Sequence, residues 1–503
     1  MPLPDTTTRA AELLELERRY CSFGDTVHYL DPPKVFSNCE GCYLYDEQGT
    51  PYLDLQMWYS AANFGYKNPR LNEALKRQVD RLPQLACQYL HPEKIEVAAR
   101  IAQYCEKRFG VKGRVHFNVG GSQAIEDSLK LVRNATGKNL MFAFMGSYHG
   151  RTLGATAITS SYRYRRRFGH FSDRAQFVFY PYCHRCIYGL KPDTCGLYCE
   201  EQFEKLFDSE YYGVWDAKAG ASEFGAFYIE AVQGTGGYVI PPADYFKRLK
   251  ETCDRHKILI VDDEIQMGFY RTGKFWAIEN FGITPDIIVF GKALTNGLNP
   301  ISGVWAREEL ISPEVFPPGS THSTFSANPL GTAIALETLK MLEEDDYETM
   351  VNEKGAHLLA GLRELERRHP ESIGQVDGLG LALRIEVCKP DRTTPDRELT
   401  DRIFAEGMAG NLEARGRKMG LVLDVGGYYK NVFTLAPAFS VTRDRNPRLQ
   451  LAAQAAAVGI YILLAWIIAA QVGLWGIQIE LPLCLVAYAT ALIFPPRRKA
   501  ARA

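Results

Sequence analysis

Two short apolar runs, rich in β-branched residues, each lead directly to a charged side chain. Residues 258–261 run into the acidic triplet 262–264, and residues 287–290 lead through one glycine to Lys292, which is 29 positions after Asp263. Runs of this length and composition are typical of strands buried in a parallel sheet. Because ligands bind at the carboxyl ends of such strands, we expect Asp263 and Lys292 to converge on one small molecule.

This pairing suits the chemistry of pyridoxal phosphate (PLP). A carboxylate at Asp263 would keep the pyridine nitrogen of the cofactor protonated, so that the ring accepts electrons. An amine at Lys292 would form a Schiff base with the cofactor aldehyde and would later move protons. The alternative is that both residues are ordinary ends of buried strands.

A glycine-rich turn earlier in the chain offers a place for a phosphate group. Gly121 and Ser122 follow the strand-like residues 115–118 and open a stretch whose apolar residues recur at helical spacing. Free backbone N–H groups and the positive end of a helix dipole favour a phosphate at such a turn. Further along, Tyr148 is an aromatic side chain suited to stacking on a flat ring.

Six segments in chain order resemble the signature blocks of the class III (subgroup II, ω-type) aminotransferases. They are GGSQAIE, YHGRT, EAVQGTGG, DEIQMGFYRTG, PDIIVFGK and STFSANP, and the resemblance covers residues 36–440. It implies an α/β fold of the type I PLP-dependent transferases, with a large domain whose mainly parallel sheet is covered by helices and with a smaller α/β domain. It also implies a homodimer with active sites shared at the subunit interface.

The resemblance assigns roles around the cofactor ring. Lys292 matches the Schiff-base lysine and Asp263 matches the partner of the pyridine nitrogen. Ile265 matches the branched residue packed under the ring, and Tyr148 the residue stacked above it. Gln266 matches the residue near the ring hydroxyl.

Further roles follow at the two ends of the cofactor. Gly121 and Ser122 match the phosphate-binding turn, and Thr324 matches a threonine that reaches the phosphate from the neighbouring subunit. Glu230 matches an acid on the substrate side. The substrate pocket is expected to include Trp58 and Tyr59.

One departure from the family pattern concerns the substrate. Many members carry an arginine near the C-terminal end, where this chain has Thr434. An arginine there would clamp a substrate carboxylate in a bidentate manner. Its absence leaves the amino donor open. Arg271 belongs to a family block and is a candidate for a structural role.

The resemblance implies ping-pong transfer of an amino group from an amine or amino acid to a 2-oxo acid. A PLP-dependent racemase or epimerase on the same fold is the first alternative, because relatives can return the proton to Cα. A non-catalytic, membrane-tethered scaffold is the second. The net charge of −1 gives no indication of a nucleic-acid partner, and the basic run at 163–167 is interpreted as a solvated loop.

Four cysteines cluster in an insertion at about residues 182–200. Cys183, Cys186, Cys195 and Cys199 have spacings that let pairs of sulfurs bind one ion, so a structural zinc is a hypothesis. An iron–sulfur cluster is a second hypothesis. Two disulfides, which a cytosolic location disfavours, and unligated cysteines are the remaining interpretations.

The pattern of elements suggests a division of the chain. We expect residues 1–66 to be the N-terminal segment of the small domain, 67–330 the large PLP-binding domain, and 331–442 the C-terminal part of the small domain.

Residues 443–503 form an apolar tail, which departs from the family pattern. Its runs at 455–477 and 481–494 are flanked by basic residues, as expected for a transmembrane hairpin that anchors a cytoplasmic enzyme through residues 455–494. A tail buried in a dimer and a non-native terminus are the alternatives.

Overall fold

The structure is a computed structural model that describes residues 6–24, 28–168, 171, 175–414 and 416–442. The apolar tail at 443–503, and with it the hairpin predicted at 455–494, lies outside these residues. Among the helices within the described ranges, none has the length and apolar character needed to cross a bilayer.

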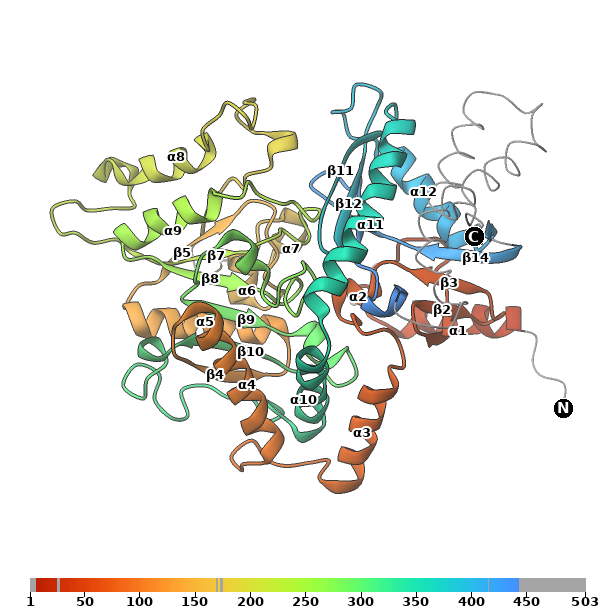
Figure 1. Cartoon of the computed structure of the whole chain (residues 1–503), viewed down its shortest axis with the longest axis horizontal. Coiled ribbons are helices and arrows are strands. Elements are labelled where there is room, and N and C mark those ends of the chain that lie inside the picture. Colours follow the sequence, from red (N-terminus) through yellow and green to blue (C-terminus); the bar gives the residue numbers. More distant parts are fainter. Residues whose placement is uncertain (1–5, 25–27, 169–170, 172–174, 415, 443–503) are drawn as a thin grey trace, which may run out of the picture.

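A seven-stranded sheet contains the two strands with charged ends (Figure 1). Its order is β4-β10-β9-β8-β7-β5-β6, and β8 (Leu259–Asp263) lies parallel to its neighbour β9 (Ile287–Phe290). The sheet is not wholly parallel, because β10 (Ser302–Arg307) runs antiparallel to both β9 and β4. The other strands are β4 (Gly113–Asn118), β5 (Leu140–Phe144), β6 (Ala175–Val178) and β7 (Phe224–Ile229).

Helices cover both faces of this sheet, which explains why the central strands β7, β8 and β9 are almost entirely buried. Successive side chains of a strand point to opposite faces. Val261 accordingly packs in a cluster with helix α5 (Gly121–Thr136), whereas Ile260 packs in the cluster that includes helices α4 (Pro92–Phe109) and α9 (Tyr245–Arg255).

Two smaller sheets lie beside the large one (Figure 1). In the five-stranded sheet, β3 (Pro51–Asp54) pairs in parallel with β14 (Arg417–Val422), so the two ends of the described chain share one sheet. Such pairing is what a small domain built from residues 1–66 and 331–442 requires, although the exact boundaries stay a prediction. The remaining strands of the two sheets are β1 (Phe36–Glu40), β2 (Tyr43–Asp46), β13 (Leu412–Ala414), β11 (Ile373–Leu379), β12 (Ala382–Val387), β15 (Asp424–Gly426) and β16 (Val432–Leu435).

Long helices connect the large sheet to the smaller ones. Helix α10 (Pro329–Glu344) packs against α3 (Pro69–Arg81) and leads to α11 (Tyr347–Arg368), which packs on β11 and β12. The other helices are α1 (Thr6–Tyr20), α2 (Met57–Ser60), α6 (Leu153–Ala157), α7 (Tyr162–Arg165), α8 (Tyr198–Glu204) and α12 (Arg397–Ala409).

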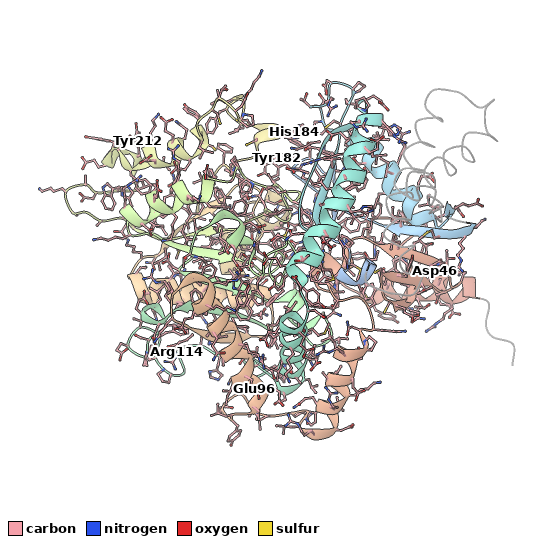
Figure 2. All side chains as sticks on the ribbon, in the orientation of Figure 1. Asp46, Glu96, Arg114, Tyr182, His184 and Tyr212 are labelled. Carbon is pink, nitrogen blue, oxygen red and sulfur yellow. The ribbon has the colours of Figure 1, made fainter. Side chains whose placement is uncertain are left out.

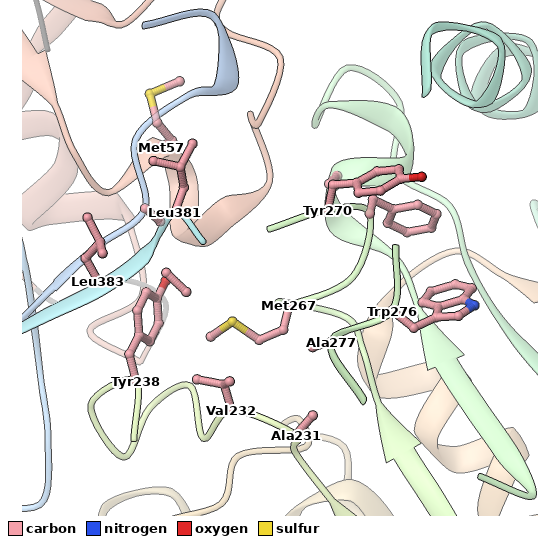
Figure 3. Packing of buried hydrophobic residues seen from close by; sticks show 14 of the residues in the cluster. Met57, Ala231, Val232, Tyr238, Met267, Tyr270, Trp276, Ala277, Leu381 and Leu383 are labelled. Carbon is pink, nitrogen blue, oxygen red and sulfur yellow. The ribbon is translucent and has the colours of Figure 1, made fainter. Parts of the chain in front are cut away.

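One continuous core joins the two parts. Figure 3 shows Leu383 of β12, and Leu381 in the turn before that strand, on the same side of this core as Tyr238. Arg271 is fully buried here and donates hydrogen bonds to the carbonyl oxygens of Leu381 (3.1 Å) and Pro437 (2.8 Å). Burial lowers the pKa of its guanidinium to about 10. These contacts support the structural role expected for Arg271.

Candidate active site

A cavity of about 330 Å³ lies at the ends of β8 and β9. This volume is within the range of small-molecule sites. Ten of the residues singled out in the sequence line it: Trp58, Tyr59, Gly121, Ser122, Tyr148, Glu230, Asp263, Ile265, Gln266 and Lys292. Thr324 does not line it. Residues far apart in the sequence therefore meet at the strand ends, as parallel sheets favour.

Strand alternation directs the acidic triplet at the end of β8. Asp263 lines the cavity, whereas its neighbours Asp262 and Glu264 are fully buried away from it. One oxygen of Asp263, Oδ2, lies 2.8 Å from Nδ1 of His149, and the other, Oδ1, accepts a hydrogen bond from the backbone N–H of Ile265 (3.1 Å). The Asp263 carboxylate is thus held from two sides.

His149 was not anticipated from the sequence. Burial alone would lower the pKa of its imidazole, but the hydrogen bond and the charge of Asp263 outweigh burial and raise the pKa. The imidazole is therefore a donor to the Asp263 carboxylate. Its place directly after Tyr148 in the YHG block was the one available signal.

Lys292 follows β9 after a single glycine. Its backbone has φ of 39°, a left-handed value that is strained for a lysine and is typical of functional positions. Burial lowers the pKa of its ammonium group, while the negative charges of Asp263, Glu230 and Asp424 act in the opposite direction. An amine with a lowered pKa is more readily available as a nucleophile and base.

The N-terminus of α5 lies at the turn where the sequence predicts a phosphate group. No side chain caps this helix at Gly120, so its first N–H groups are open to a ligand at the cavity. A Cβ atom at Gly121 would lie 2.8 Å from Cδ1 of Ile265. The missing side chain therefore lets the turn approach the residue expected under the ring, as a flat, phosphorylated cofactor requires.

Glu230 is held by backbone groups on the other side of the cavity. Its two carboxyl oxygens accept hydrogen bonds from the N–H groups of Tyr148 (2.7 Å) and Gly234 (2.6 Å). Burial and the nearby Asp263 nevertheless raise the pKa of this carboxyl to about 7. Glu230 can therefore change its protonation state near neutral pH.

The basic run at 163–167 is more than a solvated loop. Arg166 and Arg167 are exposed, but Tyr164 packs edge-on against Tyr148, with ring centroids 5.1 Å apart. The guanidinium of Arg151 lies 4.6 Å from the centre of the Tyr164 ring. Tyr164 thus fixes the ring that the family resemblance places above the cofactor.

Two aromatic side chains line the mouth of the cavity and remain open to solvent in a single chain. Trp58 is 54% exposed and Tyr59 is 38% exposed. Trp58 packs directly on backbone, since a Cβ at Gly297 would lie 2.6 Å from its ring. Gly297 also has φ of 74°, so this position suits glycine on two counts.

Thr434 lies in β16 and donates a hydrogen bond to Oδ2 of Asp424 (2.6 Å). A carboxylate thus accompanies the threonine that stands in place of the family arginine. Burial raises the pKa of Asp424. Asp424 was not anticipated from the sequence, because the three-residue strand that carries it has no distinctive pattern.

Comparison with known proteins identifies the family of the chain. The family described as aminotransferase class-III matches residues 27–450. An alanine/serine racemase of Pyrococcus horikoshii is 32% identical over 87% of this chain and 88% of its own length. A 4-aminobutyrate aminotransferase of Escherichia coli is 31% identical over 80% of this chain and 88% of its own. The structure of an amine transaminase from an uncultivated Pseudomonas species, in its PLP-bound form, covers 88% of this chain and 98% of its own with a TM-score of 0.75 and 25% identity.

Proposed function

The chain belongs to the class III aminotransferase family of PLP-dependent, fold type I enzymes, and we propose that it transfers an amino group to a 2-oxo acid at a site centred on Asp263 and Lys292. The observation that carries the proposal is the convergence of Asp263 and Lys292 on one cavity from the ends of adjacent strands. When bound, PLP supplies a ring that accepts the electrons left at the substrate Cα.

Lys292 is the proposed attachment point and proton carrier. Its buried amine has a lowered pKa, so a larger fraction of it than of an exposed lysine is neutral at neutral pH and able to accept a proton from Cα. Asp263 holds the proton on the pyridine nitrogen, and His149 keeps the Asp263 carboxylate oriented and charged. Gly121 and Ser122 bind the phosphate through the open N-terminus of α5.

The remaining residues position ring and substrate. Tyr148 and Ile265, which line the cavity, would hold the ring between them, and Gln266, whose amide donates to the hydroxyl of Tyr238 (3.1 Å), would bind the ring hydroxyl. Glu230, Trp58 and Tyr59 form the substrate side. The amino donor and the 2-oxo acid occupy this side in turn, as a ping-pong reaction requires.

We further propose a homodimer with shared active sites. Thr324 and its neighbour Phe325, which is 69% exposed, project from a loop that does not line the cavity of its own chain. Trp58 and Tyr59, at the cavity mouth, are also exposed in a single chain. A second chain packed on this face would cover both sets of residues and would bring its Thr324 to the phosphate-binding turn.

Substitution of the lysine tests the assignment. We expect purified protein to show the visible absorbance of bound PLP and to consume a 2-oxo acid when supplied with a panel of amines and amino acids. Lys292→Ala should lose both properties, while Lys430→Ala, a half-buried lysine outside the cavity lining, should keep them. Equal loss in both variants, or full activity in Lys292→Ala, would contradict the assignment. A colourless wild-type protein would instead favour the non-catalytic scaffold.

Racemisation is the second candidate, and it is favoured by the similarity to the alanine/serine racemase of P. horikoshii. Both reactions begin with removal of the Cα proton by the same lysine, and they differ in the atom to which a proton returns. Incubation of single enantiomers with and without 2-oxoglutarate separates them. Inversion of configuration without consumption of the 2-oxo acid would make racemisation the main reaction.

We propose a cytoplasmic location for the catalytic part. The cysteines in the described ranges form no disulfide bonds with one another, as is usual where thiols are kept reduced. Anchoring through residues 455–494 stays a prediction. It is tested by comparing the membrane fraction of cells that express the full chain with that of cells that express a chain ending at residue 442.

A further inference from the structure

The four cysteines of the insertion at 182–200 surround one small cavity. Cys183, Cys186, Cys195 and Cys199 all line it, and its volume of about 20 Å³ is enough for one atom the size of a water molecule. The remaining walls are largely aromatic and aliphatic. The insertion thus presents four sulfur ligands to a space that accommodates a single ion.

The backbone presents the cysteines in two matched turns. The carbonyl oxygen of Cys186 accepts a hydrogen bond from the N–H of Gly189 (3.0 Å), and that of Cys195 accepts one from the N–H of Tyr198 (3.1 Å). Each pair of cysteines therefore includes one whose carbonyl closes a tight turn. Two short turns that face each other can supply two sulfurs each to a tetrahedral ion.

All four thiols are half-buried around the same cavity, so each is partly shielded from solvent. A divalent ion would displace the thiol protons to solvent. Within the described residues, no three of these four sulfurs lie within 4.8 Å of one another, so binding would draw the two turns together.

A second set of potential ligands, His184, Glu386 and Cys388, lies close by but is a poorer candidate. Glu386 already pairs with the guanidinium groups of Arg185 and Arg384. Two arginine charges at this point repel a further cation. The recorded partners of the four sulfurs within the described ranges are the backbone carbonyl oxygens of Pro181 and Pro192, which carry no net charge.

We propose that Cys183, Cys186, Cys195 and Cys199 bind one structural zinc ion that docks the insertion onto the small domain. Arg185 lies between the first two cysteines, and it reaches Glu386 of β12 and the carbonyl oxygen of Thr393 (2.6 Å). Tyr182, directly before Cys183, also donates to Glu386. Figure 2 shows Tyr182 and His184 where the insertion meets the β11–β12 region. An ion that holds Cys183 and Cys186 in place would therefore also hold the contact between the insertion and β12.

Metal content of the full-length enzyme, purified without chelators, tests the site. We expect about one zinc per chain in the wild type and in Cys87→Ser, a half-buried cysteine outside the insertion, and a loss of at least tenfold in Cys186→Ser. Cys186→His should retain zinc, because three sulfurs and one imidazole also bind it. This variant keeps the test decisive if Cys186→Ser does not fold.

Three results would overturn the proposal. One is a wild-type protein that stays metal-free after exposure to zinc. Another is iron with an equal amount of acid-labile sulfide, which indicates a cluster. The third is an intact mass lower by two hydrogens for each of two disulfides. Lys292→Ala should retain zinc, so the metal site and the proposed function fail independently. The docking role requires that Arg185→Ala keep zinc but lower the melting temperature, as chelation does in the wild type.

Discussion

Nδ1 of His149 lies 2.8 Å from Oδ2 of Asp263, and both side chains are buried. This contact holds the carboxylate that we propose keeps the cofactor ring protonated. A hydrogen bond to a charged group contributes about 1.5–3 kcal/mol, which corresponds to a 10- to 100-fold change. We expect His149→Ala to lower kcat by that factor.

His149→Asn provides the matched comparison, because its amide N–H can donate to Asp263 from a similar position. It should recover much of the lost activity. The absorbance of bound PLP as a function of pH gives a second readout, since the ring nitrogen should lose its proton at lower pH in His149→Ala. An unchanged titration would mean that His149 has only a packing role.

The pKa of Glu230, raised to about 7, makes a prediction for the stability of the cofactor-free protein. Between the usual pKa of a glutamate and 7, the folded state binds more protons at this site than the unfolded state does. The contribution of this group to the free energy of unfolding therefore falls as pH rises through this window, by roughly 3 kcal/mol at most. Urea unfolding between pH 5 and pH 8 measures it.

Glu230→Gln should remove this pH dependence. The substitution also alters the hydrogen bonds from the N–H groups of Tyr148 and Gly234, so the informative quantity is the slope with pH and not the stability at one pH. Glu314→Gln, at a fully exposed site, should keep the wild-type slope. A wild-type slope in Glu230→Gln would contradict the raised pKa.

Asp424 makes a prediction for the reactivity of Lys292. The negative charge of Asp424 opposes the lowering of the Lys292 pKa by burial. Asp424→Asn should therefore lower this pKa further and increase the fraction of neutral amine at a given pH. We expect the rate at which cofactor-free protein takes up PLP to reach its plateau at a lower pH in this variant. Asp244→Asn, at an exposed site, should match the wild type.

Residues of the site that follow a local sequence pattern could be predicted, whereas those that depend on contacts between distant parts of the chain could not. Asp263 and Lys292 could be recognised because strand ends follow apolar runs in the local sequence. The antiparallel direction of β10 has no such signal, since an isolated apolar strand does not reveal its direction. Asp424 lies in β15 of a smaller sheet, and its charge acts on Lys292 only because tertiary folding brings the two residues near each other. His149 lies beside a recognised tyrosine, but only its contact with Asp263 reveals its role.

Thr324 provides the test of the shared site. If it reaches the phosphate of the partner chain, Thr324→Glu should inactivate the enzyme, because a carboxylate repels the phosphate. Mixed with Lys292→Ala subunits, it should regain activity, since each mixed dimer contains one site with both native residues. Random pairing gives half mixed dimers, and hence about a quarter of wild-type activity. Ser320→Glu, an exposed residue in the same loop, should remain active alone. If Thr324 instead served its own chain, mixing would restore nothing, because every site would carry one altered residue.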